Sequence, residues 1–201
     1  MASSGKGIWT PANVVTCVRV ALVPVWLLAA EFAQVRPLSG VSWSGLAVFA
    51  FYVVISLTDK LDGYLARSRG EVTTFGKFLD PIADKLAVIV ALCFLLEHGM
   101  VSSWVLLVVV AREFLVSGLR MVVASRGVVV AASNLGKWKT ATTMVSICGL
   151  LFLAALPVAD NLFVSGLSLV CYLLLAAAVV LTAWSGIDYF IKGWPYLAEE
   201  D

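Results

Sequence analysis

Residues 56–88 read "SLTDKLDGYLARSRGEVTTFGKFLDPIADKLAV", and they place four aspartates at the edges of two apolar runs. The four are Asp59, Asp62, Asp80 and Asp84. An unpaired aspartate near the centre of a membrane helix costs roughly 2.5 to 3.5 kcal/mol, and less toward its ends. Because the stretch keeps four of them, we expect a partner that offsets this cost.

The composition is that of an integral membrane protein. The chain has 201 residues, of which 61% are hydrophobic and only 13% charged, and its mean hydropathy is +0.98. Soluble globular chains carry about twice that share of charged residues. The net charge of +1 gives no basic surface of the kind that nucleic acid requires, so we expect no nucleic-acid partner.

Apolar runs separated by turn-forming residues predict an all-α fold with six transmembrane helices in one domain, residues 1–201. A helix needs about 20 apolar residues to cross the hydrocarbon layer. The runs are 14–33, 42–58, 78–96, 101–123, 141–158 and 162–191, and the second should continue as helix through the first aspartates.

The basic residues predict the orientation of these helices. They gather in the second and fourth connections and at the termini, whereas the other connections hold Arg36 as their only basic residue besides His98. By the positive-inside rule, both termini and the aspartate stretch should face the cytoplasm. We therefore expect a multi-pass protein of the cell's cytoplasmic membrane, with its site on the cytoplasmic side.

The spacing of the aspartates predicts a metal site. Asp59 and Asp62 share one helix face, as do Asp80 and Asp84, and a chain reversal between the pairs can bring them together. Carboxylates alone suit hard divalent ions, Mg²⁺ or Mn²⁺.

Small residues and an arginine follow the first aspartate pair. Gly63 and Ala66 leave room for a ligand near the backbone, and Arg67 suits phosphate oxygens. Together with the metal site, they predict that the stretch binds a diphosphate.

A plainer interpretation is that the aspartates only solvate helix ends or pair with Lys60, Lys77 and Lys85. Asp80 before Pro81 could also be an ordinary helix cap. Two matched pairs with glycine and arginine between them favour a functional site over both.

The stretch contains the pattern Asp59-x2-Asp62-Gly63-x2-Ala66-Arg67-x8-Gly76-x3-Asp80-x3-Asp84. This resembles the signature of the CDP-alcohol phosphotransferase family at every fixed position. The resemblance implies a six-helix membrane enzyme, a homodimer, with two divalent metal ions. It also implies that all four aspartates bind metal and that Asp84 is the base that deprotonates the acceptor hydroxyl.

The resemblance extends to substrates. It implies that Gly63, Ala66, Arg67 and Thr73 hold the cytidine and diphosphate of the donor. The segments "NVVTCVRVALVP", "REFLVSGLR" and "GKWKTATTM" are similar to members that transfer a phosphatidyl group from CDP-diacylglycerol to the 1-hydroxyl of sn-glycerol 3-phosphate. This similarity runs from about residue 13 to residue 144, and the last third reads as generic membrane helix.

Further polar residues could complete such a site. Arg112, Arg120, Lys137 and Lys139 could bind the acceptor phosphate, although the two lysines could equally be topology signals. Asn13 and Thr16, with Arg19, could line the donor site at the cytoplasmic end of the first helix. Helix packing is an alternative for these three.

Other functions remain open. The same chemistry could act on inositol phosphate, serine or phosphatidylglycerol. A cation transporter would use intramembrane aspartates, but near mid-bilayer and beside broken helices. A lipid-binding scaffold without catalysis would not need all four acids.

Overall fold

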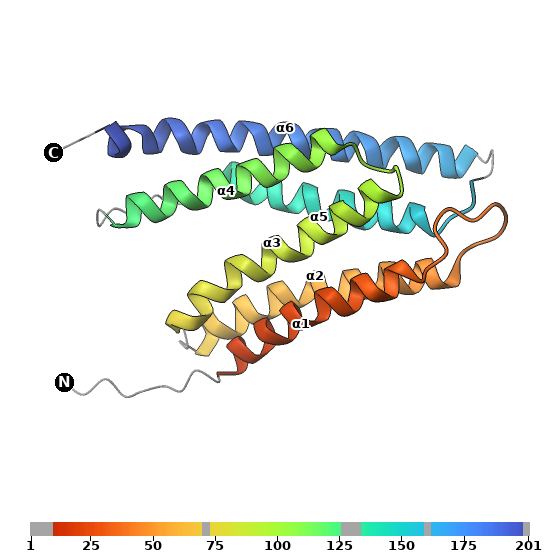
Figure 1. Cartoon of the computed structure of the whole chain (residues 1–201), viewed down its shortest axis with the longest axis horizontal. Helices are drawn as coiled ribbons and strands as arrows, with labels where there is room; N and C mark the ends of the chain where they lie inside the picture. The colour runs from red at the N-terminus through yellow and green to blue at the C-terminus, as the bar shows by residue number, and fades with distance from the viewer. Residues whose placement is uncertain (1–9, 70–72, 126–133, 159–161, 199–201) are drawn as a thin grey trace. The chain divides into compact units, whose positions relative to one another are not determined.

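The computed structural model describes residues 10–69, 73–125, 134–158 and 162–198, and within these ranges it leaves out the side chains of residues 12, 59–69, 74, 77, 125, 134 and 196–198. The described residues form six α-helices (Figure 1). They are α1 (Pro11–Glu31), α2 (Trp43–Arg69), α3 (Thr74–Glu97), α4 (Ser103–Ser125), α5 (Asn134–Ala154) and α6 (Leu162–Ala198).

The helices confirm the all-α prediction, and they reach further into polar sequence than the apolar runs do. α2 continues through the first aspartates as expected, and α3 begins four residues before the predicted run. Asp80 therefore lies inside α3 and is not its N-cap. Thr73 holds that position, because its Oγ1 accepts a hydrogen bond from Gly76 N at 3.0 Å, the usual N-cap geometry.

The fifth helix ends earlier than predicted, at Ala154 instead of residue 158. Ala155 and Leu156 donate to carbonyls three residues back, at 3.1 and 3.0 Å, which tightens the last turn. Pro157 follows, and the residue before a proline disfavours the α conformation.

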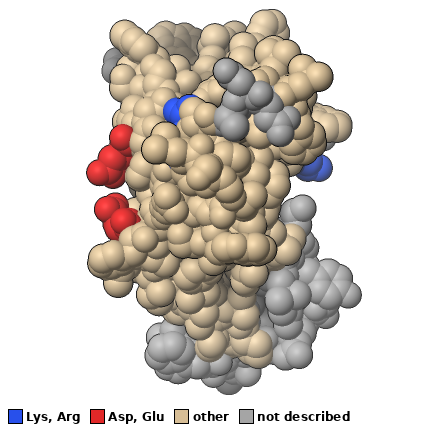
Figure 2. Space-filling view, turned by 90° about the vertical axis from the view of Figure 1, so that its right-hand side faces the viewer, with Lys and Arg blue, Asp and Glu red and all other residues tan. Residues whose placement is uncertain are grey.

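Two helical segments among the described residues are long and apolar enough to cross a membrane, Asn13–Glu31 and Leu162–Pro195. The apolar part of α2, Trp43–Thr58, is shorter. α3 and α4 carry the ionisable side chains discussed below, which interrupt their apolar runs. On the face seen in Figure 2, the described acidic and basic side chains are few. α6 exposes large apolar side chains such as Leu169 and Leu173.

The chain forms two compact units, one of residues Met1–Phe94 and Leu151–Ala159, the other of Leu95–Leu150 and Asp160–Asp201. In the first unit α1 packs against α2. Trp26 is buried there, donates from Nε1 to the carbonyl of Val48 at 2.9 Å, and contacts the rings of Tyr52 and Phe94. This aromatic core fixes the register of α1 against its neighbours.

In the second unit α4 packs against α6. Their shared core contains Val116, Leu119, Val123 and Tyr189. A Cβ at Gly193 of α6 would lie 2.7 Å from both methyl groups of Leu119, so glycine permits this close approach. Small residues at helix contacts are common in membrane proteins, where van der Waals packing drives association.

Candidate functional site

Three polar contacts join α1 to α3 within the first unit. The Asn13 amide and the Thr73 hydroxyl hydrogen-bond, with Nδ2 to Oγ1 at 2.8 Å and Oγ1 to Oδ1 at 3.0 Å. Thr16 donates from Oγ1 to Oδ1 of Asp80 at 2.9 Å. Arg19 donates from Nη1 to Oδ1 of Asp84 at 2.8 Å. We call these three contacts the aspartate ladder.

Helix periodicity explains the ladder. Asn13, Thr16 and Arg19 are three residues apart on α1, so they fall along one side of the helix. Asp80 and Asp84 are four residues apart on α3, so they lie on one side of that helix and contact Thr16 and Arg19, respectively. At the first contact, a Cβ on Gly76 would lie only 2.7 Å from Oδ1 of Asn13. Glycine at the fixed signature position 76 therefore lets α1 approach the start of α3.

Burial across the ladder is one-sided. Asn13, Thr16 and Arg19 are 3%, 1% and 1% exposed, whereas Asp80 is exposed and the Asp84 side chain is 48% exposed. The α1 side chains thus hold the carboxylates from the buried side and leave them accessible from solvent. Such outer hydrogen bonds orient the carboxylate ligands of metal sites.

The other predicted residues of the signature stretch lie on α2. Asp59, Asp62, Gly63, Ala66 and Arg67 are in its last turns, and their side chains are outside the described part. Only residues 70–72 separate the end of α2 from Thr73, so these helix ends lie within about 14 Å of one another. Figure 1 shows both ends on the same side of the first unit. The convergence of the two aspartate pairs stays a prediction.

The donor set suits a divalent metal ion. Among the residues with described side chains, no three or more acidic, histidine or cysteine residues come together, and only Asp80 and Asp84 represent the predicted ligands. Both offer hard carboxylate oxygens one helical turn apart, each held by a donor on α1. This arrangement fits Mg²⁺ or Mn²⁺.

The second unit contains a basic cluster on α4, α5 and α6. Glu113 Oε1 accepts from Arg112 Nη1 at 3.1 Å and also pairs with Lys139 Nζ. All three side chains are largely buried, at 9 to 13% exposure. Lys139 is therefore part of a buried ion-pair network, whereas Lys137 is exposed. Glu113 is thus a partner of Arg112 within the second unit.

α6 completes this cluster. Ser185 Oγ accepts from Arg112 Nε at 3.2 Å, and Tyr189 Oη accepts from Arg120 Nη2 at 2.6 Å. We define the basic cluster as Arg112, Glu113, Arg120, Lys139, Ser185 and Tyr189. The sequence interpretation of the last third as generic membrane helix missed the two α6 residues. The available signal was a serine and a tyrosine four residues apart in an apolar run.

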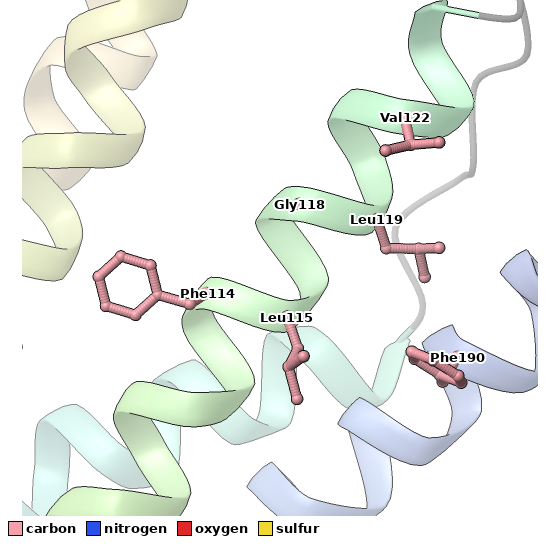
Figure 3. A pocket seen from close by; sticks show the side chains of 6 residues that line it. All are labelled: Phe114, Leu115, Gly118, Leu119, Val122 and Phe190. Atoms are coloured by element: carbon pink, nitrogen blue, oxygen red, sulfur yellow. The ribbon is translucent and has the colours of Figure 1, made fainter. Parts of the chain in front are cut away.

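An apolar hollow of about 370 Å³ lies beside α4 and is lined by Phe114, Leu115, Gly118, Leu119, Val122 and Phe190. In Figure 3 Phe114 points away from α6, whereas Leu115 and Phe190 lie between the two helices. The lining residues offer no ionisable side chain. The hollow therefore has no chemistry for phosphate or metal, and the polar sites above are the functional candidates.

Comparison with known proteins identifies the family. The family model for CDP-alcohol phosphatidyltransferases matches residues 9–185. The chain is 39% identical to the CDP-diacylglycerol–glycerol-3-phosphate 3-phosphatidyltransferase of Bacillus subtilis (strain 168), over 92% of this chain and 95% of that protein. It is 36% identical to the enzyme of the same name from Pseudomonas fluorescens, over 92% and 90%.

A relative with another name is similar over a shorter share of its length. The CMP-forming cardiolipin synthase of Oryza sativa subsp. japonica is 37% identical over 94% of this chain but only 58% of that protein. The family match covers most of the chain, including the complete signature and the α1 side of the aspartate ladder. The chain belongs to the CDP-alcohol phosphatidyltransferase family.

Proposed function

We propose that this protein transfers the phosphatidyl group of CDP-diacylglycerol to the 1-hydroxyl of sn-glycerol 3-phosphate, giving phosphatidylglycerophosphate and CMP. The observation that carries the proposal is the aspartate ladder, which presents Asp80 and Asp84 to solvent from buried supports on α1. The two bacterial relatives named for this reaction, similar over nearly their whole length, support the choice of substrates.

The reaction is a displacement at phosphorus. The 1-hydroxyl oxygen of glycerol 3-phosphate forms a bond to the diacylglycerol-bearing phosphorus, and the bond from that phosphorus to the CMP oxygen breaks. Asp84 takes the hydroxyl proton, a contribution of typically 10²- to 10⁴-fold. Arg19 holds that carboxylate through its Oδ1 and so fixes its direction.

The four aspartates would hold divalent cations, Mg²⁺ or Mn²⁺ and two in number. A site of this kind would supply positive charge to offset the diphosphate of the donor and the charge on the departing CMP. Gly63, Ala66, Arg67 and Thr73 are proposed to bind the donor. Asn13 and Thr16 take part through Thr73 and Asp80, to which they hydrogen-bond.

The basic cluster is proposed to bind the phosphate of the acceptor. Nη2 of Arg112 and Nη1 and Nε of Arg120 have no hydrogen-bond partner among the described residues. Guanidinium groups bind phosphate through paired N–H donors. Lys139 adds positive charge to the same cluster, and Lys137 is a more distant candidate on the exposed side of α5.

The proposed setting is the cytoplasmic membrane, with one catalytic domain of six membrane-crossing helices, both termini in the cytoplasm and two copies per dimer. The two long apolar segments and the exposed apolar side chains of α6 support membrane insertion. A site at the cytoplasmic edge lets the lipid tails stay in hydrocarbon while CMP and glycerol 3-phosphate exchange with water.

The test is CMP release by the purified protein from CDP-diacylglycerol, with and without Mg²⁺ or Mn²⁺. Glycerol 3-phosphate, inositol phosphate, serine and phosphatidylglycerol are compared as acceptors. Metal-dependent release with glycerol 3-phosphate supports the proposal. Release with phosphatidylglycerol alone would replace it with the reaction named for the rice relative. If none of the four acceptors supports CMP release, phosphatidyl transfer is contradicted.

A further inference from the structure

We infer that Tyr189 of α6 is a positioning residue that sets the spacing of Arg112 and Arg120 for a phosphate monoester. The inference rests on the proposed function, in which these arginines bind the acceptor phosphate. Tyr189 lies beyond residue 185, where the family match ends. Its role therefore comes from the contacts of this chain and not from the family signature.

The ring of Tyr189 is immobilised by packing. Its side chain is 2% exposed. It belongs to the core with Val116, Leu119 and Val123 of α4, so the packing of α4 against α6 holds the ring in place. A side chain that packing holds in one conformation can restrict the positions of the flexible side chains that contact it. Arginine side chains are flexible and otherwise lose considerable entropy on binding a ligand.

Both guanidinium groups lie against this fixed ring. Cζ of Arg120 is 4.8 Å from the ring centroid and Cζ of Arg112 is 5.8 Å from it, within the range of cation–π attraction. The phenol oxygen also accepts the hydrogen bond from Arg120. One buried aromatic ring thus holds two like charges that would otherwise repel each other.

Arg112 is fixed from further sides. Its Nε donates to Ser185, one helical turn before Tyr189, and its Nη1 donates to Glu113. A Cβ on Gly186 would lie 3.1 Å from Cγ of Arg112, so the glycine gives the stem of Arg112 its place beside α6. The same face of α6 therefore positions both arginines.

The chemistry points to a doubly charged ligand. Two guanidinium groups whose remaining N–H donors have no partner in the described part of the chain match the several oxygens of a phosphate monoester. Because Glu113 offsets one positive charge of the cluster, the exposed Arg120 is needed to bind a dianion. Tyr189 keeps Arg120 at the cluster, so losing the phenol oxygen should weaken acceptor binding without touching the reacting atoms.

The test compares Tyr189→Phe, which keeps the ring, and Tyr189→Leu, which removes it, with Tyr172→Phe as a matched control on the exposed side of α6. Glycerol 3-phosphate binding is measured by titration calorimetry, and KM and kcat by CMP release. We expect Tyr189→Phe to raise the Kd and KM for glycerol 3-phosphate about tenfold, and Tyr189→Leu to raise them more. The kcat and the KM for CDP-diacylglycerol should change less than about twofold in Tyr189→Phe.

The outcomes separate this inference from the proposed function. If the wild-type protein binds glycerol 3-phosphate but releases no CMP, the proposed reaction fails and a weakened Kd in Tyr189→Phe still supports positioning. Equal Kd values for the wild type, Tyr189→Phe and Tyr172→Phe would overturn the positioning role, whatever the turnover. A wild-type protein that does not bind glycerol 3-phosphate overturns both.

Discussion

The aspartate ladder and the basic cluster differ in which charged side chains they bury. In the ladder the cation is inside, since Arg19 is 1% exposed while its partner Asp84 is 48% exposed. In the cluster Glu113 is largely buried together with its partners Arg112 and Lys139, and Arg120 reaches the surface. The ladder therefore exposes carboxylates beside a buried cation, whereas the cluster buries one anion together with two cations and exposes one further arginine.

The two sites also differ in how they are built. The ladder repeats helix spacings on α1 and α3, so its members can be recognised along the sequence. The cluster depends on the ring of Tyr189 between two arginines and on α6 packing against α4. The residues of the ladder follow helix periodicity in the sequence, whereas the residues of the cluster show no such spacing and are related only by contacts between helices.

Asp84→Asn is the variant with the largest expected effect. We expect CMP release to fall at least about 100-fold, because the variant loses the proposed proton acceptor. Glu97→Gln, at the exposed end of the same helix, is the control and should keep normal turnover. Normal turnover in Asp84→Asn would mean that Asp84 is not the catalytic base.

Arg19→Met tests whether the buried cation positions Asp84. We expect turnover to drop by up to about 100-fold, since small displacements of a catalytic group cost that much, and Arg19→Lys to recover part of it. Arg36→Met, in the exposed connection between α1 and α2, serves as the control. An equal drop in Arg19→Lys and Arg19→Met, with unchanged thermal stability, would argue that geometry and not charge is what Arg19 supplies.

Glu113→Gln sharpens the contrast in buried charge. The variant leaves Arg112 and Lys139 without their shared anion, and breaking a buried pair costs about 3 to 5 kcal/mol. We expect a clear loss of thermal stability, measured by unfolding in detergent. If Glu113→Gln unfolds at the same temperature as the wild type, the ion-pair network contributes little to the stability of the second unit.

Lys137→Gln is the smallest expected effect. Lys137 is exposed, whereas Lys139 is buried against Glu113, so we expect Lys137→Gln to change the KM for glycerol 3-phosphate less than about twofold. Lys139→Gln is the comparison and should raise it more. A larger increase in KM for Lys137→Gln than for Lys139→Gln would indicate that the acceptor site lies on the exposed side of α5.

The sequence predicted the all-helical class and the residues of the ladder, because helix periodicity and the aspartate spacing are local properties. It did not distinguish donor binding from helix packing for Asn13 and Thr16, since their partners on α3 are about 60 residues away. Ser185 and Tyr189 were missed for a related reason. Their contacts with Arg112 and Arg120 join helices distant in sequence. A polar residue in an apolar helix does not indicate which residue it contacts.

We propose that the aspartates of α3 carry out phosphatidyl transfer while the basic cluster selects an acceptor that bears a phosphate. The most direct test is metal-dependent CMP release from CDP-diacylglycerol with either glycerol 3-phosphate or glycerol as the acceptor. We expect turnover with glycerol 3-phosphate, loss of turnover when divalent metal is removed, and little turnover with glycerol. Equal use of glycerol, or turnover independent of divalent metal, would contradict it.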